Sequence, residues 1–306
     1  MLQHARQAKG SWDADDVTSA RNRKRVTDLL RRLLLYATFI FWSIVFVAPF
    51  LWMLSSSLKD DPQNIAVPPI LIPNPARWQN YPEALTRLPW ALFAYNSVIK
   101  YAVPSVIGTA LSCSIVAYGF SRIQWKGRDV MFFICIGTMM IPFQVTMVPL
   151  FIIFRKLDWI NTYMPLVVPS YFGVPYFIFM LRQFFLSIPQ ELSDAARIDG
   201  CSELGILTRI ILPLAKPALA VVVLFRFIGI WNDYLGPLIY LNERDQMPIA
   251  LGLDLLRQSL GDLGHDPNIY GHIMAINTCV VLPVLVIYFF TQKTFIEGVA
   301  VTGLKG

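Results

Sequence analysis

The polar residues that could do chemistry are concentrated in one stretch of this 306-residue chain, from Ser187 to Pro217. Two alanines in it, Ala195 and Ala196, have side chains small enough to let another backbone approach closely. Charged residues surround them: Asp194, Arg197 and Asp199. Paired charges around small residues favour docking of another protein over catalysis. An amphipathic hairpin lying at a membrane surface would show the same periodicity, so the pattern alone leaves both interpretations open.

Helix signals place these residues on a helix–glycine–helix element. Gly200 follows a run of good helix formers and is a natural left-handed C-cap. Ser202 can cap a second helix, and Pro213 and Pro217 are expected to end it before the fifth span. Apolar residues of that second helix recur at helical spacing on one face: Leu204, Leu207 and Ile211.

The composition of the chain shows where this element must sit. Hydrophobic residues make up 55% and charged residues 15%, against about 25% charged in a typical soluble domain, and the mean hydropathy is +0.52. This excludes a disordered chain, a small disulfide scaffold and an ordinary cytosolic enzyme. A helix crosses a bilayer with roughly 20 apolar residues. The sequence therefore predicts an all-α integral membrane protein with six transmembrane helices: 33–57, 92–120, 130–154, 164–186, 217–241 and 271–290.

Basic residues set the predicted orientation of these spans. Segments 1–32, 121–129, 182–216 and 291–306 hold 17 Lys and Arg residues, and the alternate segments hold 7. The positive-inside rule then puts both termini and the 187–217 loop in the cytoplasm. The same topology explains the net charge of +6 without nucleic acid. The predicted regions are a basic tail (1–32), a first helix (33–58), an extracytoplasmic loop (59–91), a transmembrane core (92–290) and a cytoplasmic tail (291–306). The second span carries Pro104 and Gly108 and is expected to be one tilted or kinked helix.

The 187–217 loop resembles a known motif. Permease subunits of binding-protein-dependent ABC importers carry a loop patterned Glu-Ala-Ala, three residues, Gly, nine residues, Ile, one residue, Leu-Pro. This chain has Asp194-Ala195-Ala196, Gly200, Ile210 and Leu212-Pro213. Every spacing matches, and the one departure, Asp for Glu, keeps the charge. The resemblance covers about 33–306 and is greatest to the second permease of maltose-type carbohydrate importers. Further segments in the same order support it, among them Asn96-Ser97, Met139 to Pro142, Trp231-Asn232-Asp233 and Gly303 to Gly306.

The resemblance implies a fold, a function and a set of partners. It implies the type I ABC importer permease fold, in the plasma (inner) membrane of a prokaryote, and import of an oligosaccharide or related polyol. The expected partners are a sister permease, two cytoplasmic ATPase subunits, an extracytoplasmic solute-binding protein, the carbohydrate and the lipid bilayer, with no nucleic acid. The chain is expected to be no enzyme and to hold no catalytic residue, cofactor or metal, since the ATPase binds ATP and Mg. The ATPase-coupling residues would be Glu191, Asp194, Ala195, Ala196, Asp199, Gly200, Ile210, Leu212 and Pro213.

Two outer segments, 58–91 and 242–270, are expected either to receive the binding protein or to be plain connecting loops. An insert at 254–272 is longer than is usual for the family, and its role is left open.

Polar residues within the spans are candidates for a translocation pathway, because they are costly in lipid. The candidates are Asn96, Gln144, Arg226, Trp231, Asn232 and Asp233. A structural ion pair between Arg226 and Asp233, or a contact with the sister permease, is the alternative. Polar residues such as Asn96, Gln144 and Asn277 are more often interhelical hydrogen-bond partners than ligands.

Other functions fit less well. A secondary, ion-coupled transporter of a small polar solute would usually show related halves and several intramembrane acids, but only Asp233 is present. A membrane enzyme would need a nucleophile–base pair or a metal site, and the three histidines form no ligand cluster: His4, His265 and His272. No phosphate-binding loop exists, since Ile206 stands where its lysine would follow Gly200 and Gly205. An importer permease for a non-sugar such as a glycerol phosphate remains an alternative.

Overall fold

The computed structural model describes residues 14–262 and 268–303, with side chains at 24–258 and 268–292. The chain divides into two units, 1–55 and 56–306, which are described separately. Every element in these described ranges is helical. The expectations for residues 1–13, 263–267 and 304–306, which belong to the two tails and the insert, lie outside the described residues.

The first unit consists of one long helix. Helix α1 (Ala14–Ser57) has 44 residues, with Pro49 inside it. It begins well before residue 33, so the basic stretch is helical and continuous with the first predicted span. The segment Lys24–Ser57 is long and apolar enough to cross a membrane.

The second unit contains the remaining helices. The α-helices are α2 (Asp61–Asn64), α3 (Asn80–Arg87), α4 (Trp90–Tyr95), α5 (Val103–Ser121), α6 (Arg128–Gly137), α7 (Phe143–Lys156), α8 (Met164–Val167), α9 (Pro175–Ser187), α10 (Gln190–Ile198), α11 (Glu203–Ile206), α12 (Leu212–Leu214), α13 (Lys216–Trp231), α14 (Leu235–Tyr240), α15 (Ile249–Asp262) and α16 (Ile269–Gly303). Two π-helical segments are η1 (Asn96–Ala102) and η4 (Leu207–Ile211). Three 3₁₀ segments are η2 (Thr138–Met140), η3 (Val168–Phe172) and η5 (Arg244–Gln246).

The helices provide four to six candidate spans. Four are long enough by themselves: Lys24–Ser57, Trp90–Ser121, Met164–Ser187 and Ile269–Gln292. Two more arise if each of two bent helix pairs counts as one span. The predicted third span is not one helix, because α6–η2 and α7 meet at 96°. Pro142 causes the break, since a proline disfavours helical geometry in the residue before it, here Ile141 with ψ of 113°.

The predicted fifth span, 217–241, is also wrong in its extent. Helix α13 ends at Trp231, and the residues after it form the separate helix α14. Before α13, the segment Glu203–Leu214 meets it at 81°. The apolar run therefore continues past the end of the helix that it was expected to form.

The predicted kink in the second span is a π-helical segment instead. The Val103 N–H bonds to the carbonyl of Val98, five residues earlier. Pro104 has no N–H to offer the carbonyl of Lys100, so the regular ladder is interrupted here. Gly108 serves another purpose, because a Cβ there would lie 2.6 Å from the ring of Tyr171.

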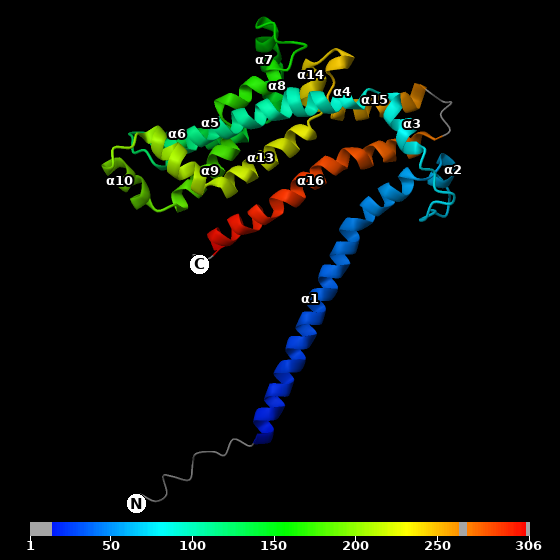
Figure 1. Ribbon diagram of the computed structural model, residues 1–306, viewed down its shortest axis with the longest axis horizontal. Coiled ribbons are helices and arrows are strands. Elements are labelled where there is room, and N and C mark those ends of the chain that lie inside the picture. Colours follow the sequence, from blue (N-terminus) through cyan, green and yellow to red (C-terminus); the bar gives the residue numbers. More distant parts are fainter. Residues whose placement is uncertain (1–13, 263–267, 304–306) are drawn as a thin grey trace, which may run out of the picture. The chain divides into compact units, whose positions relative to one another are not determined.

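The core of the second unit is built around α5 and α13. Helix α5 packs on α9 and α13, and α13 packs on α16 (Figure 1). One buried cluster joins α5, α9 and α13 to the second half of the 187–217 loop, where Ile206, Leu207 and Ile211 are buried. A second cluster joins α3, α4 and α15 to α16 through Phe93, Leu256 and Ile276.

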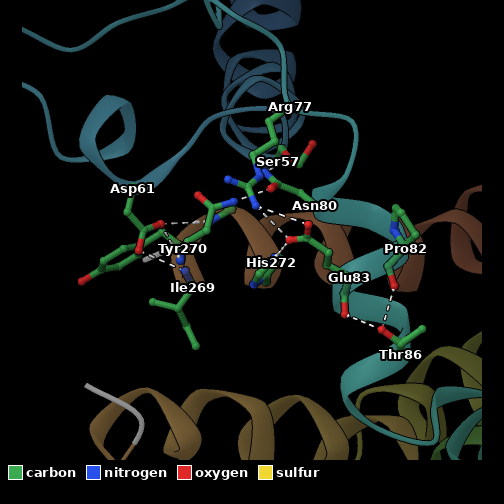
Figure 2. A network of polar contacts seen from close by, with 12 residues as sticks. Ser57, Asp61, Arg77, Asn80, Pro82, Glu83, Thr86, Ile269, Tyr270 and His272 are labelled. Atoms are coloured by element: carbon green, nitrogen blue, oxygen red, sulfur yellow. Dashed lines mark hydrogen bonds and ion pairs between the residues drawn. The ribbon is translucent and has the colours of Figure 1, made fainter. Parts of the chain in front are cut away.

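A buried polar network, which we call the α3–α16 network, fastens α16 to residues 57–83. Figure 2 shows Asn80 at its centre. The fully buried Asn80 donates from Nδ2 to the carbonyls of Ser57 and Lys59, both at 2.8 Å, and accepts from Asn268. Because all these groups are removed from water, each bond matters for stability.

The same network includes a histidine and two carboxylates. His272 is 1% exposed, and its Nε2 lies 3.0 Å from Oε2 of Glu83. Arg77 Nη2 contacts the same carboxylate at 3.1 Å. Hydrogen bonds from His272 and Arg77 hold the pKa of Glu83 below its ordinary value. Asp61 accepts the N–H groups of Ile269 and Tyr270, both at 3.0 Å, and so caps the positive end of α16.

Candidate functional site

The 187–217 loop has the predicted helix–glycine–helix form. Gly200 has φ of +80° and ends α10 in the left-handed region. Ser202 caps α11, its Oγ accepting the N–H of Gly205 at 3.2 Å. The predicted end of the second helix, at Pro213 and Pro217, is confirmed, because its helical residues stop at Leu214. Pro213 lies in the first turn of α12, where its missing N–H is tolerated, and the chain turns only after Leu214.

An ion-pair cluster joins the two helices across Gly200. Arg197 donates from Nε to Oε1 of Glu203 at 2.7 Å and from Nη1 to Oδ1 of Asp194 at 2.8 Å. Tyr118 of α5 donates to Oε2 of Glu203 at 2.5 Å. The hydrogen bonds from Arg197 and Tyr118 hold the pKa of Glu203 below its ordinary value. The loop is therefore fixed both to itself and to α5.

A buried arginine holds the start of α10. Arg122 directly follows α5 and is 4% exposed. Its Nη2 donates to the carbonyls of Phe185 and Ile188, and its Nη1 donates to Oε1 of Gln190 at 2.8 Å. The sequence pattern did not predict the roles of Arg122, Tyr118 and Glu203. Their signal was weak: a basic residue after an apolar run and an acid beyond the glycine.

Helix α10 presents an apolar stripe away from the core. Leu192, Ala195 and Ile198 recur every three residues and are exposed, Ile198 by 87%. Ser193 and Ala196 are buried on the other side, where Ala196 joins the core cluster. Only one of the two alanines is thus open to a partner. A contiguous exposed apolar stripe bordered by charged residues is typical of an interaction surface.

The remaining predicted loop residues divide into two groups. Ile210 and Leu212 pack against the core cluster. The exposed ones are Glu191, Asp194, Asp199, Gly200 and Pro213.

Two of the predicted pathway residues hold the fold together. Asn96 is fully buried, and its Nδ2 donates to the carbonyls of Asp245 at 2.8 Å and Met247 at 3.1 Å. Trp231 is also buried and donates from Nε1 to the carbonyl of Val280 at 3.2 Å. Their polar atoms are directed at this chain's own backbone.

Arg226 and Asp233 are not joined in an ion pair in the described part of the chain. Arg226 donates from Nη2 to Oγ of Ser170 at 2.7 Å. Asp233 accepts from the hydroxyl of Tyr101 at 2.5 Å and from the N–H of Gly236 at 3.0 Å. Asp233 and Tyr101 line a cavity of about 370 Å³ together with Tyr240.

Gln144 and Asn232 are exposed, and the Nδ2 of Asn232 bonds to the carbonyl of Ile228 at 2.8 Å within its own helix. The six predicted residues therefore do not converge on one site. The described residues also contain no group of three or more His, Cys, Asp or Glu that could hold a metal.

Comparison with known proteins identifies the chain. Residues 110–301 match the family described as binding-protein-dependent transport system inner membrane component. The chain belongs to this family. Permease components of such systems are not themselves enzymes, and this chain is one of these components.

Its relatives match along most of their length. The chain is 32% identical to the arabinooligosaccharides transport system permease protein AraQ of Halalkalibacterium halodurans, over 92% of this chain and 100% of that protein. It is 31% identical to the polygalacturonan/rhamnogalacturonan transport system permease protein YtcP of Bacillus subtilis, over 90% and 98%. It is 30% identical to the trehalose/maltose transport system permease protein MalG of Thermococcus litoralis, over 91% and 99%.

A solved structure has the same fold. The crystal structure of a bacterial ABC transporter involved in the import of the acidic polysaccharide alginate matches with a TM-score of 0.75 and 24% identity. The match covers 89% of this chain and 98% of that chain. The all-helical permease fold is therefore shared.

Proposed function

We propose that this chain is a permease subunit of an ATP-driven importer that carries an oligosaccharide or related polyol into the cytoplasm. The family match supports the transport role. The names of the relatives, which refer to arabinooligosaccharides, polygalacturonan/rhamnogalacturonan and trehalose/maltose, support the carbohydrate class. A sister permease, two ATPase subunits and a solute-binding protein complete the proposed assembly.

The exposed stripe of α10 carries the proposal for ATPase docking. Leu192, Ala195 and Ile198 would face a groove on the ATPase subunit, which makes α10 the coupling helix. Arg122 ties the start of this helix to α5, and Glu203 ties its end to α11 and α5. Movement of the ATPase would therefore pass to α5 as a rigid-body displacement. The ATPase can shift the equilibrium between the two states of the importer only if α10 contacts it differently in each state.

The proposed topology places the 187–217 coupling loop and both termini in the cytoplasm. The excess of Lys and Arg in these segments supports this orientation. Segments 58–91 and 242–270 would then be extracytoplasmic and receive the binding protein. Residues 92–290 would form the transmembrane core between the first helix and the C-terminal tail.

The test is sugar uptake into vesicles that hold the full complex, with co-purification of the ATPase scored beside it. Ala195→Arg places a long charged side chain on the stripe, and Gly200→Pro is incompatible with φ of +80°. Both are expected to abolish ATP-dependent uptake and weaken the ATPase contact. Thr208→Arg is the matched control, because Thr208 is exposed on the same loop but lies off the stripe. Full uptake with both Ala195→Arg and Gly200→Pro, or uptake driven by an ion gradient without ATP, would contradict the proposal.

A further inference from the structure

A second cavity lies between the α13–α14 connection, α15 and α16, and the six predicted pathway residues are not in its lining. Its volume is about 390 Å³, which is within the range of ligand pockets, about 300–1,000 Å³. Leu253, Leu256 and Ile273 supply its apolar wall. Four polar side chains share the lining: Tyr234, Asp254, Arg257 and Asn277. A mostly apolar wall with a few convergent polar groups is the composition of a small-molecule site.

The carboxylate of Asp254 is held in place before any ligand arrives. Its Oδ2 accepts from the hydroxyl of Tyr234 at 3.0 Å and from Nε2 of Gln258 at 2.6 Å. No donor among the described residues reaches Oδ1 of Asp254. The group therefore keeps a fixed orientation and has an acceptor to spare.

Asn277 is half-buried and lines the cavity, and no described residue forms a hydrogen bond with its side-chain amide. It lies eight residues after Ile269, the first residue of α16, or about 12 Å along the helix. An amide at that depth is costly unless it meets a polar partner. The amide of Asn96 finds such partners in this chain, because its Nδ2 donates to two backbone carbonyls. Asn277 instead borders the cavity, where a ligand can supply the partner.

Arg257 completes the polar lining. Its side chain is exposed, and within residues 24–258 and 268–292 it contacts no carboxylate. The lining therefore offers a guanidinium donor, a carboxylate acceptor and an amide that does both. This is the complement of a sugar hydroxyl, which donates one hydrogen bond and accepts others. The ring of Tyr234 and the neighbouring leucines can cover the apolar face of a sugar ring.

We propose that this cavity is a subsite for one sugar ring of the transported oligosaccharide. The inference rests on the proposed function and deepens it, because it assigns substrate contacts to this permease. Asn277 and Asp254 would bond to hydroxyl groups from two sides, while Arg257 closes the exposed rim. The sugar would pass through this subsite after the binding protein releases it.

The test uses the complete complex in proteoliposomes with saturating, sugar-loaded binding protein. Asn277→Leu removes both polar atoms of the amide and is expected to lower sugar uptake about tenfold. Arg257→Gln is expected to lower uptake about threefold. Because Arg257 is exposed, this substitution is not expected to affect folding. Thr278→Leu is the matched control on the next position of α16, because the Thr278 hydroxyl bonds to the carbonyl of Met274 in its own helix. It is expected to keep uptake within about twofold of the unmodified complex.

The second readout is the ATPase rate as a function of binding-protein concentration. For a sugar subsite, the half-stimulating concentration stays unchanged while uptake falls. Uptake and ATPase stimulation that fall in parallel would assign the cavity to docking of the binding protein and overturn the subsite. Unchanged uptake with both Asn277→Leu and Arg257→Gln would overturn it as well, while leaving the proposed function intact. Failure of the proposed function is distinguishable, because the unmodified complex would then show no ATP-dependent uptake.

Discussion

The two ends of the long helix Trp90–Ser121 are held in different ways. Near Trp90, the α3–α16 network is centred on Asn80, which is fully buried, and His272, which is 1% exposed. Near Ser121, Arg122 is the one charged side chain in the described part of the chain that is buried against α10, and the ion pairs of α10 itself are partly exposed. Buried hydrogen bonds are expensive to break, whereas exposed ion pairs contribute about 0.2–1 kcal/mol. The end that carries the proposed coupling helix can thus rearrange around one anchor, while the other end is fixed.

A glycine at each end shows the same contrast. Gly200 needs its conformation, because φ is +80° and nothing lies within 4 Å of where a Cβ would be. Gly271 needs its space, because a Cβ would lie 2.6 Å from Nδ2 of Asn80 and 2.7 Å from the carbonyl oxygen of Lys59. One glycine permits a turn in an open loop, and the other permits a close approach in a packed joint.

Removing the anchor is expected to have the largest effect. Arg122→Met should lower the free energy of unfolding by about 3 kcal/mol, because the carbonyls of Phe185 and Ile188 lose a charged donor. A detergent–denaturant titration of the purified permease measures this. Lys126→Met, at an exposed position of the same connection, is the control and should change stability by less than about 0.5 kcal/mol. Equal effects of the two variants would show that Arg122 is no anchor.

Filling the space beside Gly271, at the other end, is expected to have the second-largest effect on stability. Gly271→Ala should cost about 2 kcal/mol, since the added methyl group overpacks a joint that includes backbone atoms. The same titration measures it. If the variant were as stable as the unmodified chain, α16 could shift away from Lys59. This would contradict the conclusion that this end of the helix is fixed.

Substitution of Gly200 should lower the stability less than substitution of Gly271. Gly200→Ala is expected to cost about 1 kcal/mol, because only the left-handed backbone conformation is disfavoured and no clash arises. Thermal unfolding of Gly200→Ala and Gly271→Ala side by side gives the ranking. If Gly200→Ala were the less stable of the two variants, the ranking of the two glycines would be contradicted.

Acidification should give the smallest effect. The pKa of Glu83 is lowered from its ordinary value of 4.5, so its contribution is complete above that value and is lost as pH falls through the lowered pKa. The loss should be under about 1 kcal/mol, because the carboxylate is partly exposed to solvent. Glu83→Gln should be less stable than the unmodified chain at neutral pH, and the difference should shrink in acid. A difference that is constant between pH 7 and pH 3 would contradict this assignment.

Local signals in the sequence predicted local structure well. Gly200 and Ser202 were recognisable because capping depends on the residue itself and its near neighbours. The family motif was recognisable for the same reason, since its residues lie within twenty positions. The four long candidate spans follow from length and hydropathy alone.

Long-range partners could not be predicted in this way. Arg122 bonds to carbonyls more than sixty positions away, and nothing in its neighbours indicates them. Arg226 and Asp233 lie at a spacing that suits an ion pair, yet each has a different partner in the fold. The ends of apolar runs also gave wrong helix ends. Hydropathy reports how apolar a segment is, and not whether it stays helical past Pro142 or Trp231.

The π-helical segment η1 has a consequence for the angular phase of the second span. Asn96 and Ser97 are anchored to the 245–249 segment, where Ser97 accepts the N–H of Ile249 at 2.8 Å. A π-turn holds about one residue more than an α-turn, and one residue corresponds to about 100° around the axis. Deleting one residue from η1 would therefore rotate α5 by about that angle and turn Gly108 away from the Tyr171 ring. The extra residue thus sets which side of the span meets each neighbour, a property that no hydropathy profile records.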